Sequence, residues 1–260
     1  MAGGQVEAYQ EWAYAGVSAG RMYGSFFYWL FREPFPVRQL GQQIIRVMLE
    51  GFGIMVVAAV VQGGLFAWLS GWYGIKFSIV YWGGAMSMFL MLASSTTLIG
   101  AMMFAARIGT GFTVEIGSMQ MSGQLDALRL MAVEPTQHIV IPRVLASIIC
   151  LPILKAFSDA VAIGSAMLLS RWWFDISFPI FLQHAQSVLK STILTTSYIR
   201  CMFHGFFVAM NACALGFYFQ GGAIELGKTT TKSIVINLIT VLVVDTIYSV
   251  ADTLMGWSAT

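Results

Sequence analysis

Two neighbouring stretches of this sequence decide its fold: GFGIMVVAAVVQGGLFAWLSGWYGI, from Gly51 to Ile75, and FSIVYWGGAMSMFLMLASSTTLIGAMMFAA, from Phe77 to Ala106. Neither stretch contains a charged residue. A helix that crosses the hydrocarbon core of a bilayer needs roughly 20 apolar residues, because it rises about 1.5 Å per residue and must satisfy its own backbone polar groups. Both stretches are therefore predicted to span a membrane.

Three more stretches predict further spans, and charges interrupt only two of them. They are Cys201 to Ile224, Val144 to Ser170 with Lys155 and Asp159, and Ser233 to Trp257 with Asp245 and Asp252. Hydrophobic residues make up 58% of the 260 residues and charged residues only 10%, whereas about 25% of a soluble domain is charged. The predicted fold class is an all-α integral membrane protein with five transmembrane helices.

The composition also excludes several kinds of partner. The net charge is only +2, and the chain has no basic run that would follow a nucleic-acid backbone, so no nucleic-acid partner is expected. The three cysteines have neither disulfide nor metal-ligand spacing and are interpreted as small core residues. The first 45 residues do not resemble a cleavable signal, so the first span is expected to remain in the membrane.

The basic residues between the predicted spans indicate the orientation of the chain. Nine lie on the side of the amino terminus, namely Arg21, Arg32, Arg38, Arg46, Arg107, Arg129, Arg143, Lys228 and Lys232. Only three lie on the other side, namely Lys76, Arg171 and Lys190. Because cytoplasmic loops carry the excess of Lys and Arg, the amino terminus is predicted to be cytoplasmic and the carboxyl terminus extracytoplasmic.

An aromatic segment precedes the first span. It contains Trp12, Tyr14, Tyr23, Phe26, Phe27, Tyr28, Trp29 and Phe31. Aromatic side chains favour the headgroup level, so residues 1–40 are predicted to form an amino-terminal region with an amphipathic helix in the membrane interface, ending near Glu33-Pro34. A helix packed against the bundle is the alternative. Residues 41–260 are predicted to form the transmembrane domain.

A second amphipathic helix is expected between the second and third spans. Apolar residues recur at steps of four, three and four, at Met121, Leu125, Leu128 and Ala132. The opposite face carries Ser122, Asp126 and Arg129, and Glu134-Pro135 is expected to end the helix. Such a helix at the cytoplasmic surface suits a transporter that receives motion from a motor subunit. The pattern alone fits a simple surface loop equally well.

Four ordered runs in and around this segment carry a family resemblance. They are Ala105 to Gly109 (AARIG), Glu115 to Met119 (EIGSM), Gln124 to Pro135 (QLDALRLMAVEP) and Ile141 to Ala146 (IPRVLA). Together they resemble the signature of the MlaE/YrbE family of ABC-transporter permeases. The similarity extends more weakly from about Gly41 to Gly256 and includes Gly216, Lys228 to Thr231 and Asp245.

The resemblance implies a permease that pairs with a second copy or a paralogue. It also implies a cytoplasmic ABC ATPase, which would hold ATP and Mg, and an extracytoplasmic MCE-domain protein. This chain itself is expected to hold no cofactor. Such systems move phospholipids or other hydrophobic lipids between the inner membrane and the outer envelope. The segment from Glu115 to Pro135 then includes the helix that couples to the ATPase, and its candidate coupling residues are Glu115, Ser122, Gln124, Asp126, Arg129 and Pro135.

The sequence departs from the family pattern at one place. Where the family commonly has Arg-Glu-Leu-Gly-Pro, this chain has Ala93-Ser94-Ser95-Thr96-Thr97. The charged pair and the proline are both missing. A lipid-handling role of that glutamate does not transfer to this chain, and a straighter second span is expected.

Ionisable residues inside predicted spans are candidates for function, because a charge at membrane depth is costly unless it is paired or hydrated. Lys155 and Asp159 lie four residues apart and are expected to pair on one helix face. Arg200 and His204 also share a face, where the arginine either binds a lipid phosphate or reaches the interface. Asp245 is expected to satisfy a neighbouring helix. The lipid-path candidates are Ser94, Thr97, Arg200 and His204.

Two other functional classes stay open at this point. An intramembrane enzyme would need a metal site from His138, His184 and His204, which fall in separate segments, and no hydrolase or metalloprotease motif is present. A membrane scaffold, or a degenerate partner of an active permease, would fit the altered segment around Ser94. The sequence has no phosphate-binding Gly-x-x-x-x-Gly-Lys-Ser/Thr loop, so ATP hydrolysis is expected from partner subunits.

Overall fold

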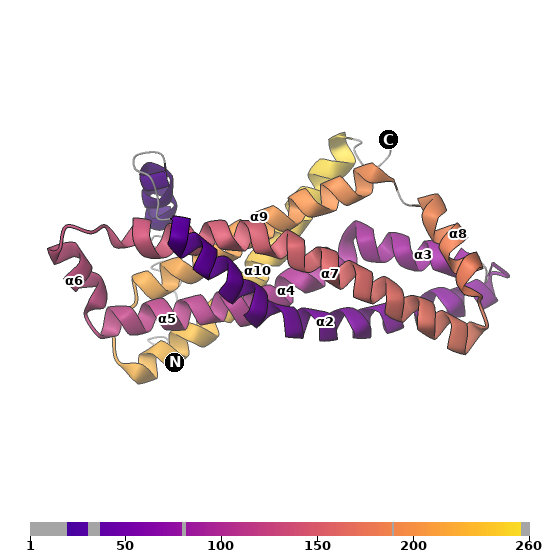
Figure 1. Ribbon diagram of the computed structural model, residues 1–260, viewed down its shortest axis with the longest axis horizontal. Coiled ribbons are helices and arrows are strands. Elements are labelled where there is room, and N and C mark those ends of the chain that lie inside the picture. The colour runs from indigo at the N-terminus through magenta and orange to yellow at the C-terminus, as the bar shows by residue number, and fades with distance from the viewer. Residues whose placement is uncertain (1–19, 31–36, 80–81, 189, 256–260) are drawn as a thin grey trace, which may run out of the picture. The chain divides into compact units, whose positions relative to one another are not determined.

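The computed structural model describes residues 20–30, 37–79, 82–188 and 190–255, except for the side chains of residues 187 and 188. All regular structure within these ranges is helical (Figure 1). Five helical stretches are long and apolar enough to cross a membrane, namely Val37–Lys76, Gly83–Met121, Thr136–Phe174, Ser191–Phe217 and Ala223–Met255. The predicted fold class, an all-α membrane protein with five spans, is confirmed.

The ends of the spans differ from the prediction. The second helical stretch does not stop before Arg107 but continues to Met121. A charged residue marks the end of an apolar stretch, whereas a helix ends only where its backbone is interrupted. No proline lies between Ala106 and Met121, and the first residue of this region with a positive φ is Gly123, at 72°.

The fourth and fifth spans also differ from their predicted bounds. Helix α9 (Ser191–Phe217) begins well before Cys201 and ends before Ile224. Helix α10 (Ala223–Met255) starts in the predicted connector, so Lys228 and Lys232 lie in its first turns. A connector therefore lies between Phe217 and Ala223, where Gly221 has a φ of 132° that a residue with a side chain rarely adopts.

The second span is not one continuous α-helix. It consists of α3 (Gly83–Leu90), a π-helical turn at Met91–Ser95, α4 (Thr96–Phe104), a second π-helical turn at Ala105–Gly109, and α5 (Thr110–Met121). At the end of the first turn, both the backbone N–H and the hydroxyl of Thr96 donate to the carbonyl of Met91. The missing proline removes one cause of a bend, but π-turns are another, so the expectation of a straighter second span stays a prediction.

The chain divides into two compact units, each built from separate segments. Unit 1 comprises Met1–Val47, Ala105–Ile149 and Gly205–Thr240. Its core includes Ile108 of the π-helical turn Ala105–Gly109, Phe112 and Ile116 of α5, Val144 of α7 (Ile141–Phe174) and Val208 of α9. Glycines let its helices approach closely, as membrane helices commonly do. A Cβ at Gly205 would lie 2.7 Å from the carbonyl oxygen of Ser147, and one at Gly216 would lie 2.8 Å from that of Thr113.

Unit 2 comprises Met48–Phe104, Cys150–His204 and Val241–Thr260. Its core joins small residues with a few large ones, namely Ala59, Ala67, Met88, Met91, Leu92, Ala162, Ala166, Ile176, Phe181 and Ala185. An additional helix, α8 (Phe178–Val188), packs against α3, and Figure 1 shows the two side by side. Helix α8 was not among the helices predicted from the sequence. All three cysteines of the chain are buried and free, as expected of small core residues.

The aromatic segment before the first span forms a helix over residues 20–30. Met22 and Phe26 are buried, Phe26 and Tyr23 contact the ring of Phe206 on α9, and the Tyr23 hydroxyl donates to Asn211 at 3.2 Å. Burial raises the pKa of Tyr23 to about 12, so this hydroxyl remains a donor. These contacts favour the alternative of a helix packed against the bundle. Its place in a membrane interface stays a prediction, and its predicted end near Glu33-Pro34 lies outside the described residues.

Candidate functional site

The predicted coupling segment begins at a turn in unit 1. Helix α5 ends at Met121, and the Ser122 hydroxyl donates to the carbonyl of Ser118 at 2.9 Å. Gly123 then adopts a left-handed conformation with φ 72°, which glycine does without steric cost. The short helix α6 (Gln124–Leu130) follows directly, and Figure 1 shows the change of direction between α5 and α6.

Helix α6 ends earlier than predicted. Ala132 has a φ of 58°, its N–H donates to Arg129, and the N–H of Val133 donates to Leu128. This is the Schellman hydrogen-bond pattern, which satisfies the last carbonyls of a helix. The prediction that Glu134-Pro135 ends the helix is therefore wrong. Pro135 instead precedes the π-helical turn Thr136–Val140 that starts the third span, a position that proline tolerates because the first residues of a helix need no N–H partner.

The apolar face predicted for this helix is only partly correct. Leu125 is fully buried, but Met121 belongs to α5, Ala132 lies beyond the helix, and both are exposed. The prediction assumed one continuous helix with 3.6 residues per turn, but the left-handed turn at Gly123 separates Met121 from α6. Two apolar residues at the end of α6 point outwards instead: Leu130 is 89% exposed and Met131 65% exposed.

The polar candidates of the segment lie at its surface. Ser122, Gln124, Asp126 and Arg129 are all exposed. Asp126 and Arg129 form an ion pair with an N–O distance of 2.8 Å. The guanidinium of Arg129 also lies 5.4 Å from the centre of the Phe217 ring, within the range of a cation–π contact. Both side chains of the pair are thus partly engaged within the chain.

Glu115 differs from the other coupling candidates because its carboxylate lies among helices. One oxygen, Oε1, accepts from Arg46 of α2 (Val37–Lys76) at 2.8 Å and pairs with Arg143 of α7 at 3.0 Å. The side chain of Arg143 is only 4% exposed, whereas that of Arg46 is 43% exposed. Arg143 also donates to the carbonyl of Ile139 and lies over the ring of Phe112. We call Glu115, Arg46 and Arg143 the three-helix clamp.

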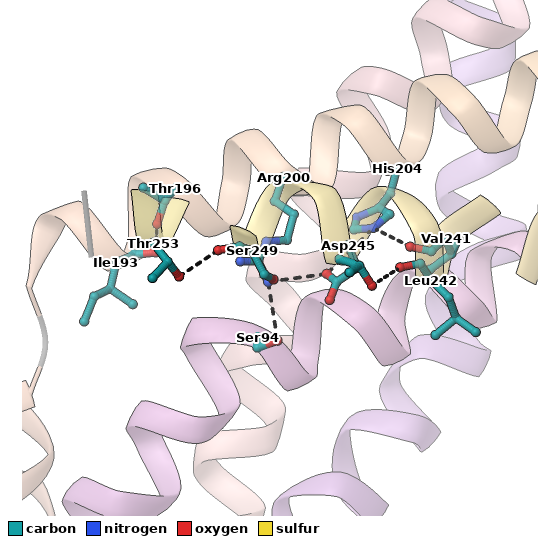
Figure 2. A network of polar contacts seen from close by, with 11 residues as sticks. Ser94, Ile193, Thr196, Arg200, His204, Val241, Leu242, Asp245, Ser249 and Thr253 are labelled. Carbon is teal, nitrogen blue, oxygen red and sulfur yellow. Dashed lines mark hydrogen bonds and ion pairs between the residues drawn. The ribbon is translucent and has the colours of Figure 1, made fainter. Parts of the chain in front are cut away.

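Three of the four lipid-path candidates meet in unit 2, where a residue from α10 joins them. Arg200 and His204 lie one turn apart on α9, and Asp245 of α10 faces both (Figure 2). The guanidinium of Arg200 lies 3.3 Å from Asp245 and 3.4 Å from the hydroxyl of Ser94, while His204 lies 3.8 Å from Asp245. The expectation that Asp245 satisfies a neighbouring helix is confirmed. We call Ser94, Arg200, His204 and Asp245 the polar cluster.

The polar cluster is shielded from the surroundings of unit 2. Arg200 and His204 are buried, with side chains 6% and 0% exposed, and the side chain of Asp245 is 13% exposed. The ring of Tyr248 lies 4.9 Å from the Arg200 guanidinium. Ser94 reaches the cluster from the π-helical turn Met91–Ser95. Thr97, the remaining lipid-path candidate, is buried and its hydroxyl has no hydrogen-bond partner within the described residues.

A second buried ion pair lies in the same unit. Lys155 and Asp159 of α7 are 2.6 Å apart, with side chains 1% and 7% exposed. The predicted pairing of these residues is confirmed. The ammonium of Lys155 also lies 5.0 Å from the centre of the Tyr198 ring. Among the residues that the structure describes, no group of three or more His, Cys, Asp or Glu is placed to hold a metal ion.

Sequence reasoning missed the partners that organise these sites. Arg46 and Arg143 were counted for the orientation of the chain and were not assigned to a site, and Asp245 was not included among the lipid-path candidates. The sequence did offer one signal for these pairs, namely charges of opposite sign in or near different predicted spans, because a buried charge needs an opposite charge nearby. Asp245 lies in the predicted fifth span, and Arg200, of opposite charge, directly precedes the predicted fourth span, which begins at Cys201.

Comparisons with known proteins agree with the architecture. The family model described as Permease MlaE matches residues 40–251. The chloroplastic protein trigalactosyldiacylglycerol 1 of Arabidopsis thaliana is 32% identical over 62% of this chain and 47% of its own length. A probable ABC transporter permease protein of Synechocystis sp. is 29% identical over 67% of this chain and 70% of that protein. Another probable ABC transporter permease protein, from Pyropia yezoensis, is 30% identical over 64% of this chain and 63% of that protein. This chain spans about half of the Arabidopsis protein, and with most of its length matched by the family model it belongs to the MlaE permease family.

Proposed function

We propose that this chain is the membrane-spanning permease subunit of an ABC transporter that moves phospholipid or a related hydrophobic lipid between the inner membrane and the outer envelope. Membership of the MlaE permease family supports the proposal. Relatives are named as probable ABC transporter permease proteins, and one bears the name of a galactolipid. The permease is a multi-pass membrane protein of the inner membrane, with its amino terminus in the cytoplasm.

The observation that carries the lipid-handling part is the polar cluster. Arg200, Asp245 and His204 are buried in helices that are otherwise apolar enough to span a membrane. Such groups are expensive in a membrane and commonly mark a substrate path. We place Ser94, Thr97, Arg200 and His204 along the lipid path. In this assignment Arg200 offers the planar guanidinium that suits a phosphate group.

In such a transporter, different subunits bind ATP, enclose the lipid path and exchange lipid outside the membrane, and each of these roles implies a partner. Two permease copies, or this chain and a paralogue, enclose the path. A cytoplasmic ABC ATPase binds ATP and Mg and supplies the energy, and an extracytoplasmic MCE-domain protein exchanges lipid with the permease. The short helix α6 serves as the coupling helix that contacts the ATPase.

The exposed side of α6 suits this contact. Leu130 and Met131 present apolar surface at the helix end, while Ser122, Gln124, Asp126 and Arg129 present polar groups beside it. An apolar centre with a polar rim is the usual composition of a protein interface. Glu115 acts differently, since its carboxylate holds Arg46 and Arg143 within the chain. Its role is to fix α5, from which α6 extends, against α2 and α7.

A reconstituted transport assay tests the proposal. The chain is expressed together with its candidate ATPase and MCE-domain proteins, purified as a complex and placed in vesicles that contain a fluorescent phospholipid. We expect lipid movement that requires ATP and Mg and that stops when the ATPase loses its catalytic glutamate. A complex that assembles and hydrolyses ATP without moving any lipid would identify the chain as a scaffold and contradict the proposal.

A further inference from the structure

The polar cluster has no surplus of positive charge. Arg200 is paired with Asp245, and Lys155, the other buried Lys or Arg among the described residues of unit 2, is paired with Asp159. An anionic headgroup entering this region would therefore meet as many carboxylates as cations. Burying a net charge in a low-dielectric site without compensation is strongly unfavourable. An anion is thus a poor match for the cluster as a whole.

The Arg200–Asp245 pair is also looser than the other buried pair. Its N–O distance is 3.3 Å, against 2.6 Å for Lys155–Asp159. The Nε atom of Arg200 is buried without a hydrogen-bond partner among the described residues. The guanidinium carries five N–H donors, of which the contacts to Asp245 and Ser94 involve only the Nη1 atom. Arg200 retains donors for an incoming phosphate while it remains beside Asp245.

A ligand that carries both charges would satisfy both partners of the pair. We infer that Arg200 and Asp245 together select a zwitterionic phospholipid headgroup, with the phosphate on Arg200 and the ammonium on Asp245. This inference rests on the proposed function, in which the polar cluster lines the lipid path. Asp245 is then a specificity-determining residue: it attracts the ammonium and repels a headgroup that brings only negative charge.

The experiment compares lipids retained by the full-length permease complex. The complex is incorporated into nanodiscs with equal amounts of phosphatidylethanolamine and phosphatidylglycerol, washed with detergent, and its retained lipids are counted by mass spectrometry. We expect roughly tenfold enrichment of phosphatidylethanolamine, the ratio that corresponds to about 1.4 kcal/mol. Asp245→Asn should bring the ratio close to one or invert it, because Arg200 then lacks its carboxylate. Asp159→Asn is the matched control at the other buried pair and should leave the ratio unchanged.

Two further arms separate the possible explanations. The double variant Arg200→Gln with Asp245→Asn leaves no unpaired charge, so it folds more readily than Asp245→Asn alone and should show no preference. Soluble glycerophosphoethanolamine in excess should not displace the lipid, which would distinguish a lipid headgroup from a water-soluble phosphate compound.

Enrichment of phosphatidylglycerol in the unmodified complex, or an unchanged ratio in both Asp245 variants, overturns the inference. If the complex retains lipid with this preference but moves none with ATP, the proposed function fails separately. If it retains no lipid at all, both fail.

Discussion

The three-helix clamp makes a quantitative prediction for Glu115→Gln. Glutamine keeps the size of the side chain but removes the charge that compensates Arg143, whose side chain is only 4% exposed. Breaking a buried ion pair by removing one partner costs about 3–5 kcal/mol. The low end applies here, because the Glu115 side chain is 24% exposed. The half-exposed Arg46 contact adds roughly 0.5 kcal/mol, for a total loss of about 3–4 kcal/mol.

Thermal unfolding of the purified protein in detergent, followed by tryptophan fluorescence, measures this loss. For a chain of this length each kcal/mol shifts Tm by roughly 2–4 °C, so Glu115→Gln should lower Tm by roughly 6–16 °C. Asp126→Asn is the matched control, since it also turns a carboxylate that faces an arginine into an amide. Both side chains of that pair are exposed, so its loss costs roughly 0.2–0.5 kcal/mol. Equal Tm shifts in the two variants would refute the reasoning that burial makes the clamp strong.

Three other predictions concern function. A cysteine at Ser122 should react with a membrane-impermeant reagent only from the cytoplasmic side, and a reporter after Thr260 should read as extracytoplasmic; labelling of Ser122 from outside would overturn the orientation. Replacing Asp126 and Arg129 together with alanine should leave the protein in the membrane but weaken ATPase association by roughly tenfold or uncouple hydrolysis from lipid movement, and pull-down plus transport assays would measure this. Arg200→Ala should lower lipid retention more than Ser94→Ala, with Arg200→Lys in between because lysine keeps the charge and loses the planar donor fork; equal retention in all three would remove Arg200 from the lipid path.

The five spans could be predicted because hydropathy depends only on the composition of a stretch. The Lys155–Asp159 pair could be predicted for a related reason, since two residues four apart on one helix meet whatever the rest of the fold does. The ends of the spans could not be predicted in the same way. Arg107 marks the end of an apolar stretch, but the helix continues beyond it. The backbone reversals at Gly123 and Ala132 decide the bounds of α6, and a helical period cannot reveal them.

The contacts within the polar cluster could not be predicted from local sequence patterns. Asp245 was recognisable as a charge inside a predicted span and Arg200 as a charge at the edge of one, yet their pairing depends on how α9 and α10 are rotated about their own axes. The three-helix clamp depends in the same way on α2, α5 and α7. Glu115 belongs to one of the runs that carry the family resemblance, so it was assigned to the contact with the ATPase. Its two arginines lie far from it in the sequence and gave no local signal.

The π-helical turn at Met91–Ser95 has a consequence for how this span tolerates insertions and deletions. A π-turn closes its hydrogen bonds over one residue more than an α-turn does, so deleting a single residue there would allow the backbone to become an ordinary α-helix. Since the π-turn takes about five residues over nearly the rotation that about four make in an α-helix, such a deletion would leave α3 and α4 in nearly the same rotation relative to each other. It would instead remove the widened turn from which Ser94 contacts Arg200. The length of this segment, as much as the identity of its residues, keeps a hydroxyl beside the arginine.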